Sequence, residues 1–197
     1  MKKLAYILLV LGLFTVAPTW AQSTFSTQYS MGFATGDTKT YVSSSSFRGV
    51  AFGYRRMVQP KIGIGIDAGW NVFYERRAYD TYTSGSKSLS GTQYRYINAV
   101  PMYVTADYYL KSEEGKGPFV GLGIGTLFSN RSTNMGLYVL SQDDWAFALQ
   151  PEAGYLVNMS QGVDAMISAK YNVGFATSDR AAQSYLTLNL GFLFNGR

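Results

Sequence analysis

The residues of this chain best suited to chemistry are charged side chains set among aliphatic residues and glycines. Carboxylates can act as general acids or bases, and arginine or lysine can pair with them. The chain contains no His and no Cys, which excludes Ser–His catalysis, His-ligated metals and thiol chemistry. We therefore predict no catalytic residue, no cofactor and no metal site. The candidate site is a charge network of Arg55, Asp67, Arg95, Asp107, Glu152, Asp164 and Lys170.

The last segment of the chain indicates which kind of element positions these charges. From Ser184 to Phe194, large apolar residues alternate with small or polar ones. Successive side chains of a strand point to opposite faces, so this pattern predicts a strand with one apolar face. About ten alternating residues suit a strand that crosses a bilayer, although a core strand of a soluble protein is the alternative.

Eight segments of this kind follow one another, separated by turn-forming or polar residues. They predict an all-β chain: an eight-stranded antiparallel up-and-down transmembrane β-barrel. High aromatic content, 21 glycines and 15% charged residues agree with that class, because ordinary globular domains carry about 25% charge. The expected strands are 25–35, 46–57, 61–75, 93–110, 118–129, 145–157, 163–175 and 184–194.

The two faces of these strands differ in side-chain volume. Aliphatic and aromatic residues occupy one face, as in Ile62, Ile64 and Ile66, while the charges share the other face with glycines such as Gly63 and Gly65. Glycines suit the crowded interior of a small barrel and would only weaken a strand exposed to water. The apolar face is therefore expected outside, in lipid, and the charges inside.

Inside a narrow barrel the charges have two interpretations. They could form a packed ion-pair network that fills the interior, or they could line a polar path through it. The network is favoured, because an unpaired charge there costs several kcal/mol. Lys170 is expected opposite Glu152 on the neighbouring strand.

The connections between the strands alternate in length. Short turns are expected at 59–60, 111–117 and 158–162, and longer polar loops at 36–45, 76–92, 130–144 and 176–183. Short turns on one rim and long loops on the other are typical of outer-membrane barrels, with the turns in the periplasm. The loop from Thr81 to Thr92 could be a surface recognition loop or a plain flexible connector.

The N-terminal segment predicts export. Lys2 and Lys3 precede an apolar run over 4–17, and small residues follow at 19–21, which is the pattern of a secretory signal peptide. We expect residues 1–21 to be the signal peptide and residues 22–197 to be the barrel domain. The charge excess of the whole chain is small, +5, and shows no basic cluster, so no nucleic-acid partner is predicted.

Together these patterns resemble the small OmpA/OmpX-type outer-membrane barrels, the outer membrane protein β-barrel domain family. The resemblance covers the whole mature chain. Its most specific part is the stretch Leu188-Asn-Leu-Gly-Phe-Leu-Phe194, which is similar to the C-terminal signal read by the barrel-assembly machinery. That signal would comprise Leu188, Leu190, Gly191, Phe192 and Phe194, and the chain adds Asn195, Gly196 and Arg197 after it.

The resemblance implies a non-enzymatic integral outer-membrane protein, a structural anchor with surface-exposed recognition loops. The alternative is a narrow passive channel for small or hydrophobic solutes, as in porin-like or OmpW-like barrels. The expected partners are outer-membrane lipids and lipopolysaccharide, with the assembly machinery and periplasmic chaperones during biogenesis. The protein is expected to be a monomer in the outer membrane, with both termini in the periplasm.

Overall fold

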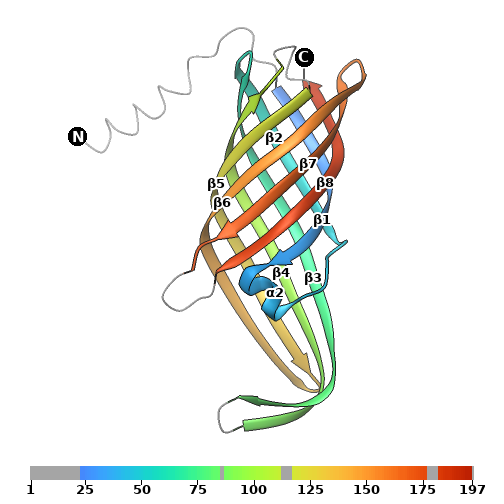
Figure 1. The fold of residues 1–197 in the computed structure, drawn as a ribbon, viewed down its shortest axis with the longest axis vertical. Helices are drawn as coiled ribbons and strands as arrows, with labels where there is room; N and C mark the ends of the chain where they lie inside the picture. The colour runs from blue at the N-terminus through green and yellow to red at the C-terminus, as the bar shows by residue number, and fades with distance from the viewer. Residues whose placement is uncertain (1–22, 85–86, 112–116, 177–181, 197) are drawn as a thin grey trace, which may run out of the picture.

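Eight antiparallel strands form a closed barrel in the computed structural model (Figure 1). The structure describes residues 23–84, 87–111, 117–176 and 182–196, so the predicted signal peptide lies outside the described residues. Each strand pairs with its neighbours in the chain, and β1 closes the ring by pairing with β8 from Ser23 to Thr35. The strands are β1 Ser23–Thr35, β2 Gly49–Gln59, β3 Ile62–Ser84, β4 Lys87–Tyr109, β5 Gly117–Met135, β6 Tyr138–Ser160, β7 Val163–Gly174 and β8 Gln183–Gly196.

The predicted fold class is confirmed, and so is the assignment of the two faces. Ile66 and Val104 are each 60% exposed on the outside, whereas Arg55 and Lys170 are 2% exposed inside. Aromatic side chains lie toward both ends of this outer surface, among them Tyr54 and Trp70. An apolar outer band between aromatic girdles is what lipid requires of a spanning barrel. No helix among the described residues is long and apolar enough to cross a membrane.

The two ends of the barrel differ. At one end, which we call the terminal rim, Ser23 of β1 pairs with Gly196 of β8, and tight turns join β2 to β3 and β6 to β7. Gly162 has a φ of +86° in the β6–β7 turn, a conformation that glycine adopts without strain. At the other end, which we call the hairpin end, β3, β4, β5 and β6 continue beyond the other strands as a four-stranded extension (Figure 1).

This extension corrects the prediction of long loops over 76–92 and 130–144. Strand β3 continues to Ser84 and β4 begins at Lys87, while β5 ends at Met135 and β6 begins at Tyr138. Residues 81–84 and 87–92 therefore belong to two paired strands, where a loop was predicted. A register shift between Arg77 and Asp80 interrupts the β3–β4 ladder, and the hairpin tip bends aside beyond it (Figure 1).

The connection between β1 and β2 also differs from the predicted loop. It contains a short helix, α2, from Gly36 to Tyr41, and the segment after the helix turns into the hairpin end of the barrel. Val42 is fully buried there, and Ser46 forms a bridge with Gly32. The ladder between β1 and β2 accordingly spans only Ser23 to Tyr29, because the connection leaves the wall to cover the lumen.

Candidate functional site

The charged residues predicted to face inward meet at the middle of the lumen. Arg55 on β2 donates from Nε to Asp107 Oδ2 at 2.6 Å and from Nη2 to Glu152 Oε2 at 2.8 Å. Two carboxylates from β4 and β6 thus share one guanidinium, whose planar fork suits paired acceptors. All three side chains are at most 2% exposed, so the bonds form in a low-dielectric site where they are strong.

A second ion pair joins opposite walls. Lys170 Nζ on β7 lies 2.6 Å from Asp67 Oδ2 on β3, and 3.9 Å from Glu152 Oε1. Lys170 also faces Glu152 in register on the neighbouring strand, as predicted. Glu152 therefore links both pairs into one group, the charged layer, which consists of Arg55, Asp67, Asp107, Glu152 and Lys170.

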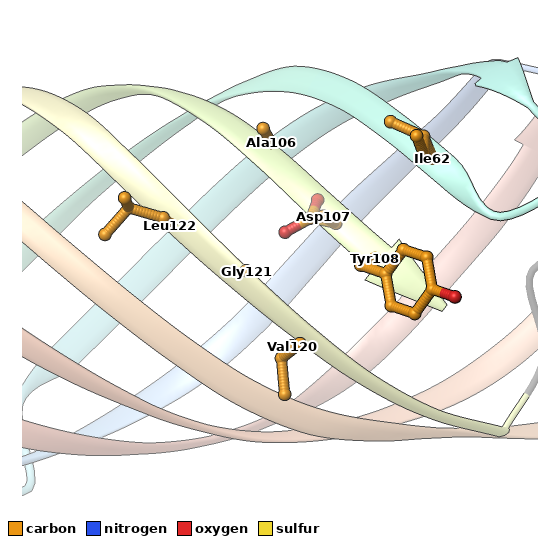
Figure 2. A pocket seen from close by; sticks show the side chains of 7 residues that line it. All are labelled: Ile62, Ala106, Asp107, Tyr108, Val120, Gly121 and Leu122. Atoms are coloured by element: carbon orange, nitrogen blue, oxygen red, sulfur yellow. The ribbon is translucent and has the colours of Figure 1, made fainter. Parts of the chain in front are cut away.

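Glycines make room for the charged layer. Gly121 on β5 pairs with Asp107 on one side and with Glu152 on the other. A Cβ at Gly121 would collide with Asp107 Oδ1, so the missing side chain lets the two carboxylates reach the same guanidinium. Figure 2 shows Asp107 and Gly121 side by side, with the outward residues Leu122 and Val120 beside them. The glycines that alternate with aliphatic residues thus leave space on the inner face for the charged side chains.

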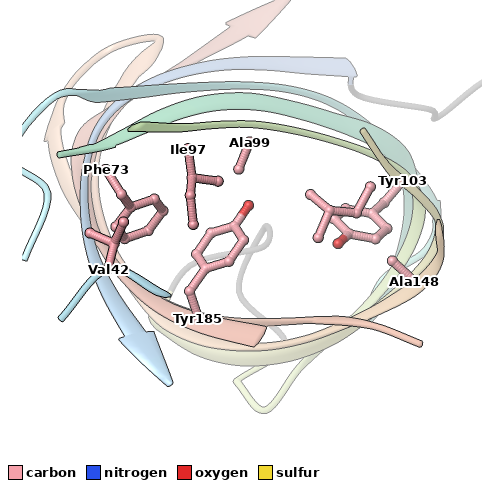
Figure 3. Close-up of a cluster of buried hydrophobic side chains, with 8 residues drawn as sticks. Val42, Phe73, Ile97, Ala99, Tyr103, Ala148 and Tyr185 are labelled. Carbon is pink, nitrogen blue, oxygen red and sulfur yellow. The ribbon is translucent and has the colours of Figure 1, made fainter. Parts of the chain in front are cut away.

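Buried apolar side chains lie in the lumen on both sides of the charged layer. Toward the terminal rim, Tyr109 and Phe119 pack together with ring centroids 5.6 Å apart, beside Leu156, Met166 and Leu193. Toward the hairpin end, Phe73 meets Tyr185 edge to face at 5.4 Å. Figure 3 shows side chains of this second cluster pointing into the barrel. The cluster comprises Val42, Phe73, Ile97, Ala99, Tyr103, Leu127, Ala148 and Tyr185.

Two of the seven predicted network residues lie elsewhere. Asp164 sits near the terminal rim, where it accepts hydrogen bonds from Asn158 and Asn195, each at 2.9 Å. Arg95 lies beyond the apolar cluster at the hairpin end, where its Nη1 donates to Tyr41 O at 3.1 Å. Both face inward as expected, but they occupy other levels along the barrel axis, so the structure brings together five of the seven.

Arg95 belongs to a second group, which we call the mouth cluster: Tyr41, Arg77, Arg95 and Arg131. The guanidinium of Arg95 lies over the Tyr41 ring at 4.9 Å, and that of Arg131 lies 5.9 Å from the same ring centroid. Arg77 Nη2 donates to Thr40 O at 3.2 Å. Arginines thus bind the last carbonyls of α2, which suits the negative end of a helix dipole.

Glu75 supports the mouth cluster from β3, beyond the apolar outer band. It accepts hydrogen bonds from the backbone and hydroxyl of Ser43 and from Arg77 Nε at 3.1 Å. Burial opposes ionisation of Glu75, but the bonds from Ser43 and Arg77 outweigh it and hold its pKa below the ordinary value. Burial also lowers the pKa of Arg95, and the nearby positive charge of Arg77 lowers it further.

Sequence reasoning did not identify Tyr41, Arg77 or Arg131 as candidate site residues. A signal for two of them exists, because Arg77 continues the inward positions Phe73 and Glu75, and Arg131 continues the inward series of β5. The prediction placed both arginines in loops, where this alternation was not followed. Among the described residues, no group of three or more carboxylates could hold a metal ion, and the arrangement is one of ion pairing and packing.

Comparison with known proteins gives similarity in structure alone. No family model matches the chain, and no curated protein matches it. Among solved structures, Ail, the attachment invasion locus protein of Yersinia pestis, superimposes with a TM-score of 0.56 at 12% identity, over 89% of this chain and 99% of Ail. A second structure, of Ail in complex with the heparin analogue sucrose octasulfate, gives the same values.

The N-terminal β-barrel domain of OprF from Pseudomonas aeruginosa gives a TM-score of 0.46 at 12% identity, over 88% of this chain and 99% of that domain. At such identities the likeness to Ail concerns the fold. The closed ring of eight antiparallel strands and the likeness to Ail lead to one conclusion: this chain has the fold of the small eight-stranded outer-membrane β-barrels.

Proposed function

We propose that this protein is a non-enzymatic, integral outer-membrane barrel, a rigid anchor that carries a recognition surface at its hairpin end. The outer band of apolar side chains supports insertion in lipid. A closed ring supports it too, because it leaves no free sheet edge within the band. The hairpin end would face the outside of the cell and the terminal rim the periplasm, because long connections of such barrels are extracellular.

The filled lumen is the observation that favours an anchor over a channel. The charged layer is buried and internally paired, and an apolar cluster lies on either side of it. Val42, from the β1–β2 connection, adds to the cluster at the hairpin end. An eight-stranded interior is just wide enough for side chains to fill, and here three successive layers do so. The passive channel remains the alternative function.

The recognition role is proposed for the four-stranded extension. It places polar and aromatic side chains, such as Tyr79 and Tyr138, well beyond the apolar band, where both are largely exposed. Ail, which shares the fold, has been solved with a sulfated ligand, so a ligand of that kind is one candidate for the hairpin end of this chain.

Membrane fractionation tests the anchor directly. The mature chain should sediment with the outer membrane and migrate faster in electrophoresis when unheated, because a closed barrel resists detergent unfolding. Surface proteolysis of intact cells should cleave the extension near Tyr138 and spare the turn at Gly162. Recovery of the chain in the soluble periplasm, or cleavage at Gly162 alone, contradicts the proposal.

A further inference from the structure

The mouth cluster gathers positive charge that the fold only partly neutralises. Arg95 on β4 has Glu75 on one neighbouring strand and Thr133 on the other, and Glu75 is already bound by Arg77. Residue 131 lies one strand away, opposite Ile97. Two guanidiniums thus lie within 6 Å of one ring centroid, while the carboxylate beside them is engaged by a third.

Arg131 contributes little hydrogen bonding to the fold. Its Nε is buried and has no hydrogen-bond partner among the described residues, and its guanidinium lies 5.9 Å from the Tyr41 ring centroid. A buried donor without an acceptor costs free energy, whereas the donors of Arg77 and Arg95 hold the carbonyls of α2. The five N–H groups of a guanidinium match the oxygens of sulfate and phosphate groups.

Charged groups of both signs lie beside the mouth cluster. Inward carboxylates near Arg131 are Glu75 on β3 and Asp144 on β6, of which Asp144 accepts from Gln142 at 3.4 Å. On α2, Asp37 and Lys39 are both exposed and carry opposite charges. The lowered pKa of Arg95, caused by burial and then by Arg77, reflects a site that a bound anion would relieve.

We propose that the mouth cluster is an oxyanion-binding site, in which Arg95 and Arg131 bind a sulfate or phosphate group of a ligand beside the Tyr41 ring. This inference rests on the proposed recognition role of the hairpin end. The site lies on the inner face of the four-stranded extension, away from the lipid-facing side. A sulfated saccharide or the phosphate of a lipid headgroup could supply the same chemistry.

Isothermal titration of the full mature barrel in detergent, at low ionic strength, tests the site with sucrose octasulfate as the probe. We expect saturable binding that Arg131→Gln weakens about tenfold, the effect of losing a charge-assisted hydrogen bond. Arg131 Nε donates no hydrogen bond within the described part of the chain, so this variant should fold normally. Arg131→Lys keeps the positive charge but loses the planar guanidinium. Its affinity should lie between those of the natural barrel and Arg131→Gln.

Arg76→Gln is the matched control, because Arg76 is an exposed arginine of β3 on the opposite face from Arg77. It should change the affinity less than threefold. Parallel titrations with lipopolysaccharide micelles and with inorganic phosphate identify the source of the oxyanion. If Arg131→Gln weakens the binding of sucrose octasulfate alone, the ligand is a saccharide. If it weakens the binding of the micelles alone, the ligand is a lipid headgroup.

Two outcomes overturn the proposed site. One is that none of the three probes binds, and the other is that Arg76→Gln and Arg131→Gln lower the affinity equally. Heat-modifiable migration of the same samples keeps this result separate from the anchor proposal. A barrel that folds and inserts but binds no probe rejects the oxyanion site and leaves the anchor intact.

Discussion

Lys170 and Asp67 join opposite walls of the barrel, with Nζ and Oδ2 2.6 Å apart across the lumen. They are separated by 103 residues and lie on β7 and β3, which are four strands apart in the ring. The pair therefore spans the lumen at the level of the charged layer. Its contribution depends on both partners being present, because either charge alone would be buried without compensation.

Lys170→Met should destabilise the barrel by about 3–5 kcal/mol, because Asp67 would keep a buried charge without its partner. Urea unfolding of the barrel in lipid vesicles measures this. The double variant Lys170→Met with Asp67→Leu serves as the control and should recover much of the loss, since it removes both charges. A single variant as stable as the natural chain would contradict the role assigned to the pair.

Leu190→Arg should cost about 2–4 kcal/mol, the penalty for arginine near the bilayer midplane on a lipid-facing position. Leu190 is 47% exposed on the outer face and lies mid-strand on β8. Phe194→Arg, at the terminal rim of the same face, is the matched control and should cost less than half as much. Equal unfolding free energies for Leu190→Arg and the natural barrel would mean that this face does not meet lipid.

Gly121→Ala should destabilise the barrel by about 1–3 kcal/mol through overpacking, because the added methyl collides with Asp107 Oδ1. Gly63→Ala is the control on the inner face of another strand, β3, where the nearest atom to an added Cβ is 3.4 Å away on Tyr109. Thermal unfolding of both variants in the same detergent makes the comparison. If the two substitutions cost the same, the space at Gly121 does not serve the charged layer.

Acid should loosen the β1–β2 connection from the mouth. The pKa of Glu75 is held down by Ser43 and Arg77, so its stabilising effect is complete above the unfolded value of about 4.3 and is lost as the pH falls through the lower folded value. Amide exchange at Ser43 should show protection at pH 6 that falls below pH 4. In Glu75→Gln the protection should be weak at both pH values; a strong, pH-independent protection in the natural chain contradicts this.

The membrane is the reason that so much of the spanning region could be predicted. Lipid demands apolar residues on the outside, so Ile64, Ile66 and Val104 alternate with small or charged inward residues. The same alternation placed Glu152 and Lys170 on one face, and their pairing in register follows from adjacent hairpins. The face that a side chain occupies and the strand with which it pairs depend on nearby residues in the sequence, so both could be predicted.

The extension and the contacts across the lumen could not be predicted in this way. Beyond the buried Phe73, charged residues follow on both faces of β3, as Glu75, Arg76 and Arg77, so no apolar face marks the strand. The prediction therefore ended the strand at residue 75 and assigned the two arginines to a loop. Which residue faces Asp67 across the lumen depends on strand tilt and stagger, which no pattern within one strand contains. The same limit placed Arg95 in the charged layer, although it lies beyond the apolar cluster of the hairpin end, beside Tyr41.

Whether the barrel conducts ions tests the central claim most directly, and planar-bilayer recording of the natural chain and of Glu152→Gln answers it. The proposed anchor function predicts no stepwise conductance for either protein, because the buried apolar clusters on both sides of Glu152 stay in place. The variant should instead unfold more easily, since Arg55 and Lys170 lose a buried partner. Discrete ion-selective steps in the natural barrel, with a selectivity that Glu152→Gln changes while unfolding is unaltered, would contradict the account and identify a channel.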